Sequence, residues 1–181
     1  MRYKSFSDNS ISIQPALNDG MGQAVKPKVL KREVVEAFYR ALAERNYERV
    51  ALYLDDDIRW SISGPVELLP FCGQRVGKAA AMDVITRLVP QVLATRHFLP
   101  DMKLVEGDCA AILARLYGTQ PNGRAISYRI SHFMRFRNNK IVEYTSVLDS
   151  FDAAEQVLGH HIELPKQVSP PLAADDDMVS V

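Results

Sequence analysis

The stretch SHFMRFRNNKIVEYTSVLDSF, residues 131–151, decides the fold. Apolar and polar residues alternate on both sides of a pair of asparagines, which is the pattern of two strands joined by a short turn, and the second strand runs into a helix. One face of these strands carries His132, Tyr144 and Ser146 among apolar residues. The pattern predicts a hairpin that either lines a pocket or belongs to a core with a few polar groups.

The elements around this hairpin follow from hydrophobic periodicity and from turn residues. Helices are expected over 31–46, 47–54 and 78–93, a strand within 55–65, a loop over 64–77, strands at about 97–106, 109–120, 124–136 and 140–149, and a closing helix that ends at Gly159. Helices followed by consecutive antiparallel strands predict an α+β domain, with the helices on one face of a curved sheet. Such a sheet leaves a cone whose mouth can admit a small ligand.

Composition limits the class of protein. The 181 residues suffice for one domain with a real core, and 22 basic residues balance 22 acidic ones, which does not favour binding of nucleic acid. The two cysteines are expected to be free thiols, and neither a signal peptide nor a membrane span is apparent, so we expect a cytoplasmic protein without membrane contact. We expect a flexible arm over 1–27, the folded domain over 28–163 and a tail over 164–181.

The turns of the sheet predict which side chains share a face. Asn122-Gly123 predicts a two-residue turn, and "FRNNKI" predicts a three-residue loop, because a two-residue Asn-Asn turn would bring Glu143 and Thr145 to the apolar face. The inner face is then expected to hold Leu113, Arg115, Tyr117, Tyr128, Ile130, His132, Met134, Val142, Tyr144, Ser146 and Leu148. This face is too apolar for a solvated surface and too polar for an unbroken core, which favours a partly hydrated pocket.

The order of elements, together with the segments 44–60 (ERNYERVALYLDDDIRW) and 140–159 (KIVEYTSVLDSFDAAEQVLG), resembles the nuclear transport factor 2-like superfamily in its SnoaL-like and ketosteroid isomerase-like branch. The resemblance covers about residues 30–160 and implies the cystatin-like cone fold. Proteins of this fold include enzymes, ligand binders and assembly modules, so the resemblance alone does not assign an activity.

Ketosteroid isomerases use a Tyr on the first helix, an Asp base on the first strand and a protonated Asp in the oxyanion hole. The resemblance aligns these positions with Phe38, Ile62 and His132. The phenol and the base are therefore expected to be missing, and an imidazole replaces the acid. A steroid isomerase of that mechanism is not expected.

Limonene epoxide hydrolases are also similar to this chain, and their Arg and two Asp residues align with Leu113, Arg115 and Ser146. SnoaL-type polyketide cyclases use an acidic base in the last strand, for which the nearest candidates are Ser146 and Asp149. Activation of water by a carboxylate is therefore not expected, and Asp149 is expected to cap the following helix.

His132, Arg115 and Tyr144 are the candidate catalytic residues. His132 near its ordinary pKa of about 6.5 could act as acid and base, and Arg115 could hold a carboxylate or an oxyanion. The candidate ligand-binding residues are Phe38, Trp60, Ile62, Leu113, Tyr117, Tyr128, Ser146 and Leu148. Alternative interpretations remain: a hydrogen-bonded core His, an Arg neutralised by an internal acid, and aromatic residues that only fill the core.

These residues predict a pocket protein that binds a small apolar carbonyl-containing molecule, with isomerase-, cyclase- or lyase-like proton transfer. The alternative is a non-catalytic ligand-binding or assembly module of the same fold. No cofactor is implied, because the sequence has no phosphate-binding Gly-rich loop, and no metal site is predicted, since the adjacent His160 and His161 point apart. The outer sheet face is expected to form a homodimer.

Overall fold

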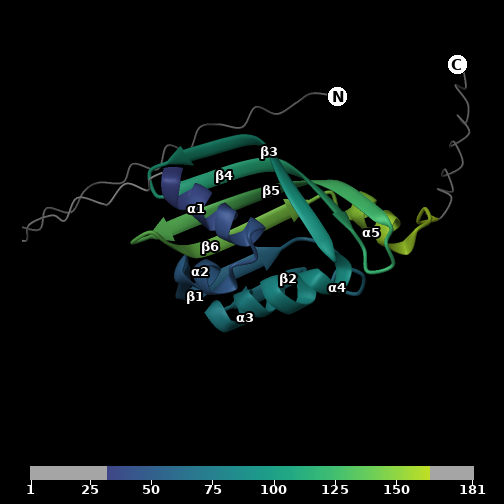
Figure 1. Ribbon diagram of the computed structural model, residues 1–181, viewed down its shortest axis with the longest axis horizontal. Helices are drawn as coiled ribbons and strands as arrows, with labels where there is room; N and C mark the ends of the chain where they lie inside the picture. The colour runs from purple at the N-terminus through teal and green to yellow at the C-terminus, as the bar shows by residue number, and fades with distance from the viewer. Residues whose placement is uncertain (1–31, 164–181) are drawn as a thin grey trace, which may run out of the picture.

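The computed structural model describes residues 32–163 (Figure 1). Its elements are α1 (Arg32–Ala43), α2 (Tyr47–Leu52), β1 (Leu54–Ile62), β2 (Gly73–Val76), α3 (Lys78–Asp83), the π-helical turn η1 (Val84–Leu88), α4 (Val89–Val92), β3 (Thr95–Glu106), β4 (Cys109–Thr119), β5 (Ala125–Arg137), β6 (Lys140–Leu148) and α5 (Ser150–Leu158). The expected α+β class is confirmed. The predicted arm and tail, 1–27 and 164–181, lie outside the described residues.

Within the described residues, six strands form one sheet in the order β2-β1-β6-β5-β4-β3. Neighbouring strands are antiparallel except β1 and β6, which are parallel. Side chains alternate along the strands, and in β5 every second residue from Ile126 to Phe136 is buried. Figure 1 shows α1 crossing the curved sheet, with α2, α3 and α4 on the side of β1 and β2 and α5 at one end. The buried face of the sheet and the inner stripes of these helices form the core.

The turn between β4 and β5 differs from the prediction. Gln120 and Arg124 are the last pair, Gly123 N–H donates to the Gln120 carbonyl over 2.9 Å, and Gly123 is left-handed with φ 84°. The loop therefore has three residues, Pro121 to Gly123. A two-residue turn would require an N–H from Pro121, which proline lacks, whereas proline suits the second position of the observed turn.

This extra loop residue moves β4 by one position against β5, so His132 lies opposite Ile112 and Ile130 opposite Ala114. The predicted two-residue turn would have placed His132 opposite Leu113, so this prediction was wrong. Because a shift of one residue exchanges the two faces of a strand, Leu113, Arg115 and Tyr117 lie on the outer face rather than the inner one.

The turn between β5 and β6 is also shorter than predicted. Asn138 and Asn139 are both left-handed, with φ 53° and 63°, and form the two-residue turn that the sequence analysis rejected. The pairing then shifts between Phe136–Ile141 and Arg135–Glu143, which leaves Val142 as the extra residue of a β-bulge. The bulge restores the expected faces, so Tyr144, Ser146 and Leu148 are buried as expected. The predicted three-residue loop would have paired them with His132, Ile130 and Tyr128, whereas they pair with Met134, His132 and Ile130.

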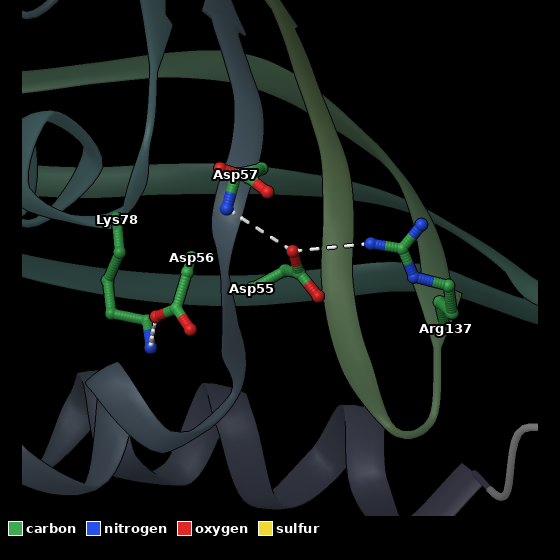
Figure 2. Close-up of polar contacts among 5 residues, drawn as sticks. All are labelled: Asp55, Asp56, Asp57, Lys78 and Arg137. Carbon is green, nitrogen blue, oxygen red and sulfur yellow. Dashed lines mark hydrogen bonds and ion pairs between the residues drawn. The ribbon is translucent and has the colours of Figure 1, made fainter.

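Three consecutive aspartates, Asp55 to Asp57, occupy the stretch of β1 where its pairing with β6 is irregular. Figure 2 shows that they bind different neighbours: Asp55 Oδ1 accepts from Asp57 N–H over 3.2 Å and from Arg137 over 3.4 Å, and Asp56 pairs with Lys78 at 2.5 Å. The aspartates therefore link β1 to the β5–β6 turn on one side and to α3 on the other.

Three further details differ from the predicted elements. Gly73–Val76, expected as loop, is the edge strand β2. The predicted helix over 78–93 is interrupted by the π-helical turn just before Pro90, whose missing N–H would leave a carbonyl unpaired in a regular helix. Pro100 is tolerated because β3 is the other edge strand, where the register shifts at that residue. No helix in the described part has the length and hydropathy needed to cross a membrane.

Helix α5 is fixed at both ends and in its middle. Asp149 caps its first turn by accepting from Asp152 N–H over 3.3 Å, as predicted, and Gly159 ends it in a left-handed conformation. The Gln156 amide accepts from Ser127 N–H and donates to the Ser127 carbonyl, both at 2.8 Å. The Gln156 side chain thus makes the two backbone hydrogen bonds that a neighbouring strand would otherwise make to Ser127, at the place where β5 extends past the end of β6.

We expect Gln156→Ala to lower the free energy of unfolding by about 1–2 kcal/mol, because it leaves both Ser127 backbone groups without their partner. Urea unfolding of the purified protein would measure the change. Gln91→Ala is the matched control, since Gln91 is exposed on α4 and makes no side-chain hydrogen bond within the described residues. Equal stability of the two variants would contradict this role of Gln156.

Candidate functional site

A cavity of about 850 Å³ lies between α1, the helices η1 and α4, and the inner face of the sheet. Its wall is mainly apolar and aromatic, with Leu42, Trp60, Ile62, Phe71, Ile85, Val89, Leu93, Phe98, Ile112, Leu116, Ile130 and Tyr144 among the lining residues. Its size is typical of a site for one small organic molecule. Four of its polar side chains, Tyr39, His132, Trp60 and Ser146, bear most directly on the chemistry that it can support.

Tyr39 and His132 form a hydrogen-bonded pair. The Tyr39 hydroxyl lies 2.6 Å from His132 Nδ1, and either atom can donate, depending on the imidazole tautomer. The two rings are nearly parallel, at 8° with centroids 5.8 Å apart, and Phe98 stacks on the His132 ring at 11° and 4.8 Å. Helix α1 and strand β3 therefore hold the imidazole in one orientation. Within residues 32–163, its other nitrogen, Nε2, makes no hydrogen bond.

Two polar atoms of the cavity wall, Trp60 Nε1 and Ser146 Oγ, are buried and have no hydrogen-bond partner among residues 32–163. They come from adjacent strands, since Ile62 of β1 pairs with Ser146 and Trp60 pairs with Tyr144. Trp60 is held by a stack on Tyr144, with centroids 3.7 Å apart, and Ser146 lies opposite His132 in the β5–β6 pair. Because a buried unpaired donor is costly, a ligand oxygen that accepted hydrogen bonds from these atoms would be stabilised.

Burial keeps the imidazole of His132 and the phenols of Tyr39, Tyr128 and Tyr144 uncharged. It lowers the pKa of His132 to about 3, so the imidazole is neutral at physiological pH and does not have the ordinary pKa that the sequence analysis assumed. Burial raises the pKa of Tyr39 well above its usual value, with a smaller contribution from the nearby Tyr144, and it also raises the pKa of Tyr144 and of Tyr128. The inner cavity thus presents neutral hydrogen-bonding groups in an apolar wall.

Of the eleven site residues predicted from the sequence, six line the cavity and five do not. Those that line the cavity together are Trp60, Ile62, Tyr128, His132, Tyr144 and Ser146. Those that do not are Phe38 and Leu148, which are buried outside the lining, and Leu113, Arg115 and Tyr117, which lie on the outer face. For the epoxide hydrolase positions, the inward neighbours Ile112 and Ala114 carry no charge either, so the expected absence of a carboxylate mechanism is unaffected by the register error.

Most of the lining residues were not predicted from the sequence, and two of these, Tyr39 and Arg96, carry polar groups that matter for the chemistry of the cavity. The resemblance aligned Phe38 with the helix phenol, but the structure turns Phe38 into the core and brings the next residue, Tyr39, to the cavity. Tyr39 follows Val35 by four residues, so the helical stripe contained this signal. Arg96 was missed because the strand was expected to begin one residue after it.

Comparisons with known proteins agree with this architecture. The model of the SnoaL-like domain family matches residues 35–144. A proposed isomerase from Rhodopseudomonas palustris is 36% identical, with a TM-score of 0.61 over 70% of this chain and 93% of that one. A nuclear transport factor 2-like protein of unknown function from Burkholderia pseudomallei is 24% identical, with a TM-score of 0.64 over 69% of this chain and 95% of that one. No curated protein matches the chain.

The fold is also similar to that of an epoxide hydrolase of the limonene epoxide hydrolase type from M. tuberculosis. The two proteins are 14% identical, and the match has a TM-score of 0.57 and covers 70% of this chain and 88% of that one. The curved sheet, the helices over its concave face and the cavity between them define a cone-shaped α+β protein with the nuclear transport factor 2-like fold. Within it, the chain belongs to the SnoaL-like family.

Proposed function

We propose that the protein binds a small apolar carbonyl-containing molecule in this cavity and promotes its isomerisation by proton transfer. The observation that carries the proposal is the combination of the Tyr39–His132 pair with two unpartnered groups, Trp60 Nε1 and Ser146 Oγ, in an apolar cavity. A carbonyl oxygen matches the two unpartnered groups, because it accepts hydrogen bonds and gains negative charge during enolisation.

His132 is the proton carrier of this proposal. In the tautomer that donates from Nδ1 to the Tyr39 oxygen, Nε2 has a free lone pair. It takes a proton from a carbon near the carbonyl: the C–H bond breaks, an N–H bond forms, and the electron pair moves to the carbonyl oxygen. The imidazolium then returns the proton to another carbon of the same conjugated system. The product is an isomer, and His132 is neutral again.

The low basicity of His132 restricts the substrate. Because burial lowers its pKa to about 3, it can remove a proton only from an activated C–H, such as one between a carbonyl and a double bond or a second carbonyl. Hydrogen bonds from Trp60 Nε1 and Ser146 Oγ to the enolate oxygen lower the barrier further. The likeness to the proposed isomerase of Rhodopseudomonas palustris supports the same class of reaction.

The test begins with binding and continues with turnover. Trp60 is the only tryptophan in the chain, so its quenching by a panel of apolar ketones and enones reports occupancy of the cavity. For each β,γ-unsaturated enone that binds, ultraviolet absorbance follows formation of the conjugated isomer.

We expect His132→Gln to reduce this isomerisation at least tenfold while the dissociation constant changes less than threefold. Tyr117→Phe is the control, because Tyr117 lies outside the cavity on the outer face. Undiminished turnover in His132→Gln would remove His132 from the mechanism and leave only binding.

The second candidate function is a non-catalytic ligand-binding module. It is favoured by the scarcity of acids: among the described residues that line the cavity, Glu36 is the one carboxylate, and it lies 4.0 Å from Lys103. This alternative predicts saturable quenching of Trp60 by a ligand that is recovered unchanged after hours with the protein.

A further inference from the structure

The charged residues that line the cavity come from α1, from the turn that follows it, and from β3. In the described part of the chain, the charged lining residues are Arg40, Arg45, Arg96 and Lys103, which are basic, and the acid Glu36. Lys103 and Glu36 compensate each other at 4.0 Å. Within residues 32–163, no carboxylate lies within ion-pair distance of the three arginines. Among the described residues, the cavity lining therefore carries positive charge without a matching acid, which attracts an anionic group.

Of the three arginines that line the cavity, Arg96 is the one that lies in a strand of the sheet. It alternates with Phe98 along β3, so both side chains are directed to the cavity, and Arg96 is partly buried. Its guanidinium is close enough to Tyr128 to oppose the effect of burial on the pKa of that phenol. A partly desolvated guanidinium without a counter-charge is unfavourable, and a carboxylate would satisfy it with two parallel hydrogen bonds.

Arg45 reinforces the same region. It has a left-handed backbone with φ 54°, and its Nη2 donates to the Ala94 carbonyl over 2.9 Å. This contact holds the second guanidinium beside the start of β3, two residues before Arg96. Two elements far apart in the sequence thus bring positive charge to one side of the cavity.

The rest of the wall favours a planar molecule. Four contacts connect five aromatic or imidazole rings in a continuous series: Trp60 with Tyr144 at 3.7 Å, Tyr144 with His132 at 5.1 Å, His132 with Phe98 at 4.8 Å and Phe98 with Tyr39 at 5.3 Å between centroids. Flat aromatic surfaces of this kind bind aromatic or conjugated ligands by stacking and by apolar burial.

We propose that the ligand is a planar aromatic or conjugated compound with a carboxylate, and that Arg96, assisted by Arg45, binds this carboxylate while the carbonyl end lies towards Trp60 and Ser146. This inference rests on the proposed function for its choice of cavity, and it adds the substrate class. Arg96 is then a specificity-determining residue, because it distinguishes the acid from a neutral compound of the same shape.

Calorimetric titration with 2-naphthoate and with 2-naphthamide tests the proposal, because the two probes share a shape and differ in charge. In 25 mM salt, the wild type is expected to bind naphthoate at least fivefold more tightly than naphthamide. Arg96→Gln is expected to weaken naphthoate binding about tenfold and to change naphthamide binding less than twofold. Arg96→Lys keeps the charge and should retain most of the preference, which separates recognition from a folding defect.

Arg115→Gln is the matched control, because it removes the same charge from the outer face of the adjacent strand. It should leave both affinities unchanged. The proposal is overturned if the wild type does not prefer naphthoate, if Arg96→Gln weakens both probes equally, or if Arg115→Gln has as large an effect as Arg96→Gln. Naphthamide binding without a preference for naphthoate would leave the proposed function standing, whereas a cavity that binds neither these probes nor any ketone would remove both.

Discussion

Acidification from pH 7 to pH 4.5 is expected to lower the free energy of unfolding by about 2–3 kcal/mol through His132 alone. In the unfolded chain its pKa is about 6.5, and in the fold it is about 3. At pH 4.5 the unfolded state therefore binds a proton that the folded state does not, so lowering the pH favours unfolding. The loss begins as the pH falls below about 6.5 and is complete near pH 3.

The surroundings of the imidazole explain why the folded state resists protonation. The groups around it are the phenols of Tyr39 and Tyr144 and the ring of Phe98, and burial raises the pKa of both phenols, so none supplies a negative charge. The nearest acid of the cavity lining, Glu36, is paired with Lys103. An imidazolium would thus be desolvated without a counter-charge.

Urea unfolding at several pH values between 7 and 4.5 measures this effect. The difference between wild type and His132→Gln isolates His132 from the carboxylates that also titrate in this range. His97→Gln is the control, because it removes an exposed imidazole, paired with Tyr117 across β3 and β4, in the same type of substitution. Parallel curves for wild type and His132→Gln would mean that water in the cavity solvates the imidazolium, and His132 would then be a stronger base than we propose.

The sequence predicted the elements of the fold well and the details of its turns poorly. Alternation along β5 and β6 is long and regular, so the burial of His132, Tyr144 and Ser146 could be predicted. The face of β4 could not, because one proline before Asn122-Gly123 changes the loop length by one residue and inverts the strand. The preference of Asn-Gly for two-residue turns holds only if the residue before it can donate its backbone N–H, which Pro121 cannot do.

The cavity depends on contacts between distant segments, and these explain the missed residues. Tyr39 reaches His132 across 93 positions of sequence, and no local pattern reports that contact. The β5–β6 bulge is a similar case: the rejected two-residue turn is correct, and the compensating Val142 is evident only when β6 is paired on both sides. The sequence thus predicted that polar residues line a pocket, but it did not predict that the arginine in the pocket wall is Arg96 rather than Arg115.

The outer sheet face leads to the prediction with the largest effect. Two rows of side chains cross it, Leu104–Ala111–Phe133–Thr145 and Met102–Leu113–Ser131–Val147, as the strand registers show. Leu104, Met102, Phe133 and Val147 are 46–58% exposed. Contiguous apolar side chains of this kind are rare on a monomer surface, and we propose that a second copy of the chain covers them about a two-fold axis.

Phe133→Glu is expected to weaken this dimer at least a thousandfold, because a two-fold interface contains the buried charge twice. Sedimentation velocity between about 1 and 100 μM would show the wild type as a dimer and the variant as a folded monomer. Leu52→Glu is the control, since Leu52 is 71% exposed on α2, away from the outer face. A wild type that stays monomeric throughout this range would show that the face is left open or binds a different partner. Loss of the dimer in both variants would place the interface elsewhere.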